Sequence, residues 1–422
     1  MSMLTYDQLH NAVAGSAAGI RCRTDLAPLG GPGDKVFPPT YVVERNAETQ
    51  YATEVRRVGG QEFLAVVLDS VASQANRLEL ALLDAYRAGA LGLPVLSVDF
   101  RDTEARDLGR ISALEASHRV FDALFRDSLL DGVLFRESPV GKAITDATPR
   151  NAAALYHHAP TTLLFGGWDS TGPRGGRGAK YERAITSEIV GLGVTLGVKT
   201  ASRLDPAGIE LKAGDLYEAS DSSQGAWTLD EGEAALEKGK PKKYGKGKQL
   251  GRPSQANFGN VPPTIDSKAG GVTVDHIVAT AVLSFIQLRR LRFPLDHIGV
   301  PLSEADLGAA EVAARATLAA LGLAAAVLAF GEGFDLRSRC VLVPEAPPGF
   351  ELVGRAGETS SFDLDRESAL ALLDEGRQRA AGLGLTWAEE ERLLQPRPQL
   401  VELIKRSHAL AAREEPDENE HD

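Results

Sequence analysis

The sequence predicts an α+β fold, with an α/β sheet as the alternative, because short apolar strand segments alternate with helical segments along the chain. The 422 residues are enough for two domains or one large elaborated domain. Apolar residues make up 43% of the chain and charged residues 25%, which is ordinary for a soluble globular protein. We therefore expect a core large enough for independent folding.

The first elements are a strand that runs into a loop, then a second strand and a helix. The loop, residues 26–40, reads LAPLGGPGDKVFPPT and is too rich in Gly and Pro to be helical. Residues 63–68 form a continuous apolar run and predict a buried strand. Ser70 is placed to cap the following helix, and apolar residues then recur at helical spacing up to Gly89.

The alternation continues through the next hundred residues. Residues 94–100 predict a short strand and residues 112–128 a helix. Residues 148–157 begin with Thr-Pro, the pattern of an N-cap followed by proline, and predict a short helix. Residues 161–165 predict another strand.

The second half contains one long irregular segment and then mostly helix. Residues 205–263 are dominated by Gly, Lys, Ser and Pro, and a loop of this length is usually functional or disordered. Residues 272–274 predict a strand and residues 275–292 an apolar helix. From Ser303 onward we expect Ala/Leu-rich helix with one strand at residues 340–343.

Cysteine usage and apolar runs restrict the class of protein. Cys22 and Cys340 lie far apart and outside any Cys/His cluster, so we expect no zinc site and no disulfide framework. Residues 1–19 lack the pattern of a signal peptide. The apolar stretch at residues 317–330 is too short to span a bilayer and predicts a buried helix. These features indicate a cytoplasmic protein without metal or cofactor.

The net charge of −12 argues at first against a nucleic-acid partner, but the charge is unevenly distributed. Residues 166–300 hold 18 Lys and Arg against 15 Asp and Glu, a net of +3 that leaves −15 for the rest of the chain. Residues 413–422 contain six acids and one Arg and predict a disordered acidic tail. Because local charge sets the field near a surface, an acidic protein can still present a basic groove.

The strongest functional signal is the segment LLFGGWDSTGPRGGRGAKYER, residues 163–183. Glycine lets a backbone approach phosphate closely, arginine supplies paired donors, and Trp168 and Tyr181 offer stacking faces. We interpret the segment as a phosphate-binding loop, with a solvated basic loop as the plainer alternative.

A second signal is the run KGKPKKYGKGKQLGR, residues 238–252, which has seven positive residues and no acid. Such a run is typical of a flexible arm attracted to phosphate without sequence preference, although a solubilising loop has the same composition. Asn76 and Arg77 lie off the apolar stripe of the first long helix and are weaker candidates for facing a ligand.

Several enzyme motifs are absent from the sequence. Residues 30–35 lack the GK[ST] ending of a P-loop, and Leu196 stands where a dinucleotide fingerprint needs its third glycine. Trp168 occupies the first glycine position of a GxSxG elbow. Asp34 is the one acid of catalytic interest, although an Asp in a Gly/Pro loop commonly forms a turn.

Taken in order, four segments resemble one known family, the RAMP-superfamily backbone subunit of type I-U (also called I-G) CRISPR effector complexes. These segments are residues 26–40, 68–79 (LDSVASQANRLE), 165–183 and 257–263 (NFGNVPP). The resemblance covers residues 20–300 most strongly, whereas the helical remainder is less distinctive.

The resemblance implies a modified RRM core, a ferredoxin-like antiparallel sheet with helices on one face. It implies a non-catalytic subunit whose copies line up along a CRISPR guide RNA and leave its bases free to pair with target DNA, as parts of a complex with a large subunit and a guide-processing subunit. The RNP-one aromatic signature of ordinary RRM proteins is absent, so loops rather than the sheet face are expected to hold the RNA.

We accordingly predict three regions: an RRM-like core with basic insertions at 166–183 and 238–260 (residues 1–300), a mostly helical region (301–412) and the acidic tail (413–422). The basic, amide and aromatic side chains expected to bind RNA are Arg21, Arg23, Lys35, Asn76, Arg77, Trp168, Arg174, Arg177, Lys180, Arg183, Lys240, Lys242, Lys243, Lys246, Lys248 and Arg252.

Two alternatives belong to other functional classes. The first is a relative that cleaves target RNA with a divalent ion, as in type III systems, with Asp34 as the catalytic residue. The second is a phosphate-handling metabolic enzyme in which residues 166–180 cradle the anion.

Overall fold

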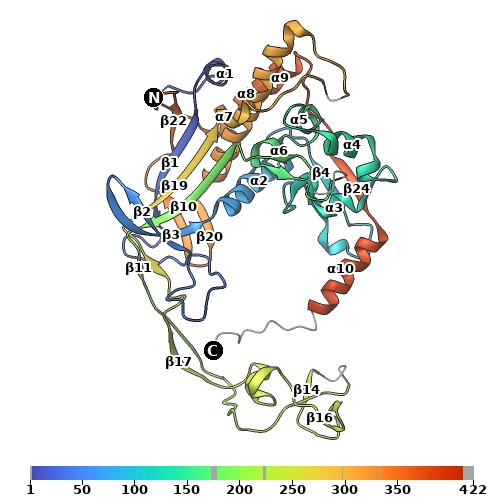
Figure 1. Cartoon of the computed structure of the whole chain (residues 1–422). Helices are drawn as coiled ribbons and strands as arrows, with labels where there is room; N and C mark the ends of the chain where they lie inside the picture. Colours follow the sequence, from blue (N-terminus) through green and yellow to red (C-terminus); the bar gives the residue numbers. More distant parts are fainter. Residues whose placement is uncertain (1, 173–177, 222–224, 297, 332, 412–422) are drawn as a thin grey trace.

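The computed structural model describes residues 2–172, 178–221, 225–296, 298–331 and 333–411 (Figure 1). These residues form a mixed α+β protein with a curled antiparallel sheet and ten α-helices, which confirms the predicted class.

The main sheet consists of nine strands: β1 (Gly19–Pro28), β2 (Thr53–Val58), β3 (Gln61–Asp69), β10 (Ile185–Leu192), β19 (His276–Ser284), β20 (Phe334–Arg337), β21 (Cys340–Pro344), β22 (Gly349–Val353) and β23 (Thr359–Phe362). Its order is β2–β3–β10–β19–β1–β21–β20, and β22 and β23 extend it beside β1. One edge of β1 pairs with β19 from Gly19 to Leu26, and its other edge is shared by β21 and β22. β1 is therefore the central strand.

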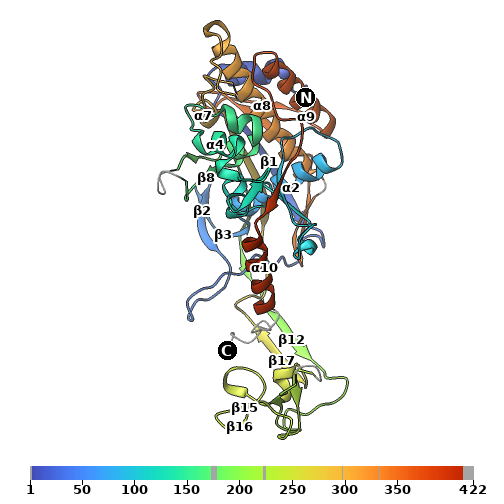
Figure 2. The same cartoon turned by 90° about the vertical axis from the view of Figure 1, so that its right-hand side faces the viewer.

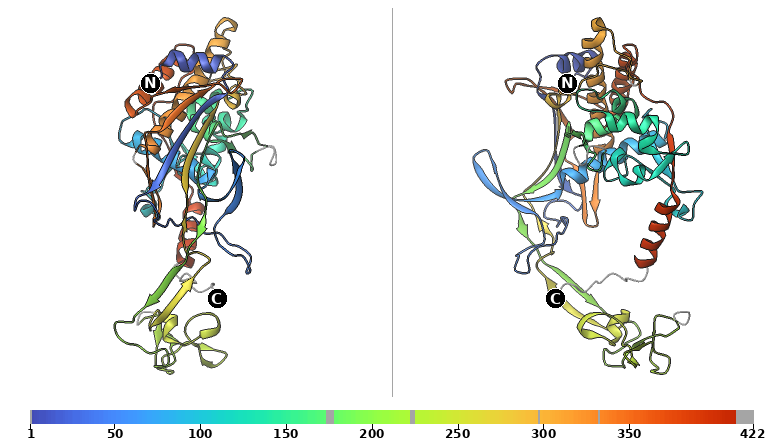
Figure 3. Two further views of the ribbon diagram at one scale, coloured as in Figure 1. Left: turned by 90° about the vertical axis from the view of Figure 1, so that its left-hand side faces the viewer. Right: turned by 45° about the vertical axis from the view of Figure 1, so that its right-hand side comes forward.

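Helices cover one face of this sheet, which the left panel of Figure 3 shows with the strands in front and the helices behind. They are α1 (Tyr6–Ala14), α2 (Val71–Arg87), α8 (Glu304–Phe330) and α9 (Arg366–Ala381). Residues Asp306–Phe330 of α8 are long and apolar enough to cross a membrane, but 78% of their most apolar window is buried inside the protein. α8 is thus the central core helix, which confirms the predicted buried helix.

A second sheet lies beside the first and has the order β5–β4–β24–β6–β7. Its strands are β4 (Leu96–Asp99), β5 (Arg110–Ser112), β6 (Ser128–Leu130), β7 (Val133–Leu134) and β24 (Arg392–Pro396). Because β24 comes from near the C-terminus, this sheet joins distant parts of the chain. The remaining helices are α3 (Ala123–Arg126), α4 (Pro139–Asp146), α5 (Ala153–His158), α6 (Pro160–Phe165), α7 (Phe285–Leu288) and α10 (Pro398–Ala411).

Residues 199–266, here called the arm, extend away from the body (Figures 1 and 2). The shaft of the arm is the pair β12 (Lys199–Arg203) and β17 (Val261–Asp266). Its tip carries two short hairpins, formed by β13 (Tyr217–Glu218) with β14 (Trp227–Thr228) and by β15 (Leu236–Glu237) with β16 (Lys240–Pro241). The pair β11 (Thr195–Leu196) and β18 (Val272–Thr273) joins the shaft to the body.

Several predicted elements are confirmed. The strands expected at residues 63–68, 94–100 and 340–343 are β3, β4 and β21, and the strand expected at 272–274 is β18. Ser70 caps α2 by accepting a hydrogen bond from the backbone of Ser73.

The helix predicted at residues 275–292 is wrong, because most of this segment is strand β19 followed by the short helix α7. Alternate residues of β19, from Ile277 to Leu283, are buried, which is the period of a strand. Ile, Val and Thr are abundant in the segment, and their restricted side-chain rotamers favour strands.

Four other predictions also differ from the structure. Beyond Ser303 one strand was expected, but the described residues also form β20, β22, β23 and β24, because β22 and β24 pair with distant strands of the two sheets and β20 and β23 pair with adjacent strands. Residues 112–128 are not one helix: Arg119 has a φ of 52°, which no helix interior accommodates, and only residues 123–126 are α-helical. Residues 161–165 belong to α6 instead of a strand, with Pro160 in the first turn and burial on all sides. The Thr148–Asn151 segment is a turn, and the helix expected there begins only at Ala153.

Candidate nucleic-acid interface

The face of the main sheet opposite the helices is uncovered and presents charged, polar and valine side chains. β1 places Arg21, Arg23 and Asp25 on this face, since Ile20, Cys22, Thr24 and Leu26 alternate with them and are buried. The residues of β19 that pair with these three are Val282, Thr280 and Val278. The residues of β10 that pair in turn with those of β19 are Thr186, Glu188 and Val190. None of these positions is aromatic, so the central strands provide no platform for base stacking.

Each arginine on this face has a carboxylate neighbour. Arg21 Nη2 lies 2.6 Å from Glu351 Oε2, and Arg23 Nη2 lies 3.8 Å from Asp25 Oδ1. Arg56, on β2, pairs at 2.8 Å with Glu188. Half-exposed ion pairs of this kind contribute little free energy, so a phosphate can compete with the carboxylates for the guanidinium groups.

The uncovered face is hollowed by three adjoining cavities of about 380, 680 and 690 Å³. Arg23 lines all three, and Asp25 lines the two larger ones. The first is also lined by Arg56 and Thr186, and the third by Arg21. The cavities therefore form one trough along the sheet, centred on Arg23.

The loop at residues 26–40 holds the base of the arm. Lys35 Nζ donates hydrogen bonds to the carbonyl oxygens of Val198, at 2.6 Å, and Gly270, at 3.3 Å. Val36 forms a β-bridge with Val272. Lys35 was predicted to bind RNA, and in the structure its ammonium group links the two segments on either side of the arm.

Residues 68–79 form a buried polar network under the sheet. Asp69, 1% exposed, accepts hydrogen bonds from Gln74 at 2.6 Å and Arg77 at 3.0 Å. Arg77 also donates to the carbonyl oxygens of Asp335 and Leu336, so its guanidinium group ties α2 to β20. Asn76, one residue earlier, is exposed.

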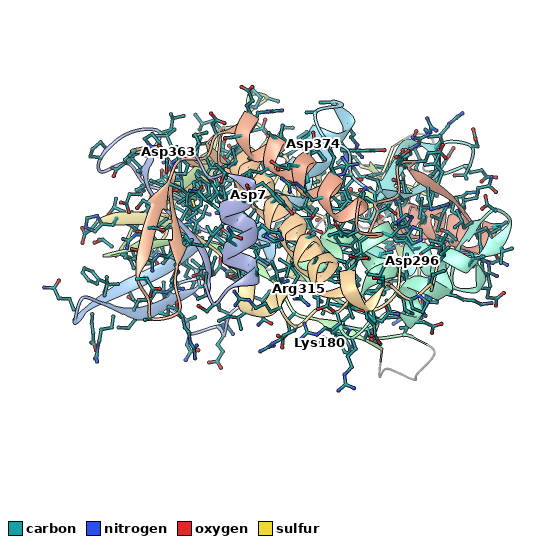
Figure 4. All side chains as sticks on the ribbon, turned by 90° about the horizontal axis from the view of Figure 1, so that it is seen from above. Asp7, Lys180, Asp296, Arg315, Asp363 and Asp374 are labelled. Atoms are coloured by element: carbon teal, nitrogen blue, oxygen red, sulfur yellow. The ribbon has the colours of Figure 1, made fainter. Side chains whose placement is uncertain are left out.

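The Gly-rich segment is a hairpin whose described strands are β8 (Gly167–Trp168) and β9 (Lys180–Tyr181). Trp168 is 53% exposed and Lys180 and Arg183 are exposed, and Lys180 lies at the edge of the molecule in Figure 4. Tyr181 is buried against Phe121, so the stacking face expected of it is not available. The predicted Arg174 and Arg177 lie outside the described residues.

Arg136 ties the part of this hairpin that follows β8 to the body. Its guanidinium group donates to the buried carboxylate of Asp169 and to the carbonyl oxygen of Thr171. A Cβ atom at Gly178 would clash with the backbone carbonyl of Asp169, so the hairpin needs glycine there, and Gly172 packs against the carboxylate of the same residue. The glycines therefore shape the hairpin and do not by themselves indicate a ligand.

The arm carries the basic run on its tip. Lys242 pairs with Glu218 at 2.5 Å and Lys243 with Asp215 at 2.9 Å, whereas Lys240, Lys246 and Arg252 are exposed and make no ion pair within the described chain. Lys248 belongs to a short 3₁₀-helix, and its side chain lies outside the structural description. The basic side chains thus divide into a paired set and an unpaired set.

The NFGNVPP segment, residues 257–263, folds the junction between tip and shaft. Asp205 accepts from the backbone N–H of Gly259 at 2.5 Å, and its own backbone N–H donates to Asn260 at 2.7 Å. Gly259 has a φ of 91°, a conformation that favours glycine. The segment therefore holds the tip in place on the shaft.

Asp34 is exposed and lines the 680 Å³ cavity together with Asp25, Asp275 and Glu345. Across the described ranges, no group of three or more His, Cys, Asp or Glu side chains is close enough to hold a metal ion. The structure therefore gives no support to a metal centre at Asp34.

Comparison with known families tests the resemblance directly. Residues 20–196 match the family model described as CRISPR-associated protein GSU0053 (Cas_GSU0053). The resemblance to a CRISPR-associated family is confirmed. No curated protein matches the chain. The Cas_GSU0053 match includes three of the four segments named above, whereas the arm and residues 257–263 lie beyond it.

Sequence reasoning missed Arg56 and the acids that face the arginines. Strand β2 puts Arg56 on the same side as Glu54 and Val58, but its sequence TEVRRV has no apolar alternation and therefore gives no local signal of the strand. The pairing of Arg21 with Glu351 joins residues 330 positions apart, so no local signal reveals it.

Proposed function

We propose that this protein is a non-catalytic guide-RNA-binding backbone subunit of a type I CRISPR complex. Its copies line up along one guide RNA, in a complex with a large subunit and a guide-processing subunit, and present the guide for pairing with target DNA. The proposal includes an RRM-like core for the main sheet and a cytoplasmic location. The CRISPR-associated family match over residues 20–196 is the observation that carries it.

The site supports this proposal through its chemistry. The trough offers arginines on central strands that carry no aromatic residue on that face, although Phe63 of β3 lines one of its cavities. The arm adds unpaired basic side chains. Such groups can bind phosphate whatever the base attached to it, which suits a subunit that must accept any guide sequence. Base pairing by the guide then supplies the sequence specificity.

Purification of the chain together with its CRISPR RNA and partner subunits tests the proposal. We expect co-purified RNA of uniform length, seen as a raised ratio of absorbance at 260 and 280 nm and as one band on a denaturing gel. Arg23→Ala, in the centre of the trough, should reduce the bound RNA about tenfold, equivalent to roughly 1.4 kcal/mol.

Arg57→Ala is the matched control. Arg57 lies next to Arg56 on β2 but pairs with Glu62, and its side chain is 70% exposed. We expect this variant to retain its RNA. Absence of co-purified RNA from the wild-type complex, or an equal loss in both variants, would contradict the proposed function.

A further inference from the structure

Two leucines of α10, Leu403 and Leu410, here called the stripe, lie on the side that faces away from the protein, whereas Leu400 and Ile404 of the same helix pack against the body. Val401 is its buried residue, and Lys405 pairs with Glu104 of the body. Leu403 and Leu410 are 65% and 58% exposed. At 3.6 residues per turn, Leu403 points about 160° away from both Val401 and Lys405. An isolated helix of this length is marginally stable in water, so this stripe calls for a packing partner.

A groove of about 540 Å³ lies elsewhere on the molecule, between α2, the end of α8 and β20. α2 and its C-cap contribute one face to it. This face has Arg77, Ala81, Asp84 and Ala88 at the spacing i, i+4, i+7 and i+11, together with Ala85 and with Leu80, which is 41% exposed. The opposite wall is apolar and is formed by Leu328, Ala329, Phe334 and Leu336. Ala81 and Ala88 leave a shallow channel along α2 that large side chains of another helix would fill.

The stripe and the groove match in spacing and in charge. Leu403 and Leu410 are seven residues apart, as are Ala81 and Ala88, and each pair therefore spans about 10.5 Å along its helix. The groove edge has exposed charges of both signs, Asp84 and Arg366. α10 also carries both signs beside its stripe, in Glu402 and Arg406, which now pair only with exposed neighbours on the same helix. Each charge on the helix thus has an opposite charge available at the groove.

We propose that α10 of one copy docks, through Leu403 and Leu410, into the α2–α8–β20 groove of a second copy. This inference rests on the proposed function, in which copies line up along a guide. Figures 1 and 3 show α10 and β20 well separated within one chain, so each copy offers one helix and one groove. A contact between two different surfaces can repeat from copy to copy, and it produces an open filament where the rotation between copies does not close a ring.

The contact is small beside the roughly 1,600 Å² buried in a typical stable interface. It is therefore effective only when a guide RNA already holds two copies together at high effective concentration. We expect the free protein to remain monomeric and the docked helix to appear in the RNA-bound assembly.

Cysteine cross-linking tests the contact. The native Cys22 and Cys340 are free and buried, so they do not compete with introduced surface thiols. We would place Leu403→Cys and Ala88→Cys in one chain, assemble the complex with its guide RNA, and treat it with a short bismaleimide linker. We expect a ladder of dimers and longer species on a denaturing gel, and at least about tenfold less of it from either single variant.

The matched control pairs Leu403→Cys with Val55→Cys, whose position on the edge strand β2 is 65% exposed. A ladder no stronger than that of the control overturns the inference, as does a linkage within one chain or to another subunit. Bound RNA is measured in the same samples. RNA without the ladder overturns the docking alone. A ladder without RNA overturns the proposed function and shows that the docking does not depend on the guide. Loss of both overturns both.

Discussion

A buried ion pair joins α2 to the segment that leads to the second sheet. Glu79 is 1% exposed, and both of its carboxylate oxygens accept hydrogen bonds of 2.6 Å from Arg119. The Arg119 guanidinium group also lies 5.9 Å from the centre of the Phe165 ring. Burial raises the pKa of Glu79 to about 7, although the hydrogen bonds from Arg119 lower it. The charge of Arg183 lowers the pKa of Glu79 as well, but only Arg119 donates hydrogen bonds to the carboxylate.

Arg119→Met should lower the free energy of unfolding at pH 8 by about 3–5 kcal/mol, because it leaves a buried carboxylate without its partner. Between about pH 4.5 and 7 the folded state binds more protons at Glu79 than the unfolded state, so the unfolding free energy of the wild type falls as pH rises through this window. In the variant the charge disappears as Glu79 is protonated, so the loss should shrink toward acidic pH. Urea unfolding at several pH values measures it.

Glu79→Gln combined with Arg119→Met is the control for this prediction. It removes the charge together with its partner, and we expect it to recover part of the lost stability at pH 8. A double variant as unstable as Arg119→Met would show that the guanidinium group contributes through packing instead of charge.

Among the elements, the arm is the one least supported by the body. Its shaft strands are mostly exposed, and Ile265 is 73% exposed. The tip has its own small core, in which Trp227 contacts Phe258 edge to face at 5.8 Å and Leu216 is buried. A two-stranded ribbon without packing on either face is marginally stable, so the arm depends on its junctions.

Replacing residues 205–260 by a short Gly-Ser turn should leave the body folded, with a thermal unfolding midpoint within a few degrees of the wild type, because the deleted residues contribute little to the main core. RNA affinity should fall, since the basic run is removed. Circular dichroism measures the first effect and filter binding the second. A variant that fails to fold would show that the arm stabilises the body.

The local sequence pattern predicted helices and strands correctly where the spacing of apolar residues had one clear period. It failed where contacts with distant segments determined the secondary structure. β3 and α2 follow from an apolar run, Ser70 and helical spacing. β19 has an apolar run long enough for a helix, and only the burial of every second residue identifies it as a strand. Many basic residues of the candidate site could be found in the sequence, because they stand in segments rich in Lys, Arg and Gly. Their partners, such as Asp215 for Lys243 and Glu351 for Arg21, could not, because folding brings them together from distant segments.

The whole molecule has a net charge of −12, and its arm carries a few cations that form no ion pair among the described residues. Because such cations release counterions when they bind phosphate, RNA affinity should fall strongly as the salt concentration rises. Replacing Lys240, Lys246 and Arg252 together by Gln should reduce the slope of log affinity against log salt by about 2, at roughly 0.7 per phosphate contact. The loss should be similar for guides of different sequence. Fluorescence anisotropy at salt concentrations from about 50 to 400 mM measures this slope, because counterion release controls the affinity in that range.

Lys242→Gln with Lys243→Gln is the matched control, because these two lysines already pair with Glu218 and Asp215. We expect a smaller change of slope per residue. An unchanged slope in the triple variant, or equal changes in both sets, would count against the arm as a phosphate contact.

The central position of β1 has a consequence for how the protein is made. β1, at residues 19–28, is synthesised well before its neighbours, which are β19, at residues 276–284, and β21 and β22, at residues 340–353. Its backbone hydrogen bonds must wait until most of the chain has been synthesised, because such distant pairings form late and slowly. During translation, residues 19–28 would therefore remain an open strand that invites aggregation, and nascent chains stalled before residue 276 should bind chaperones.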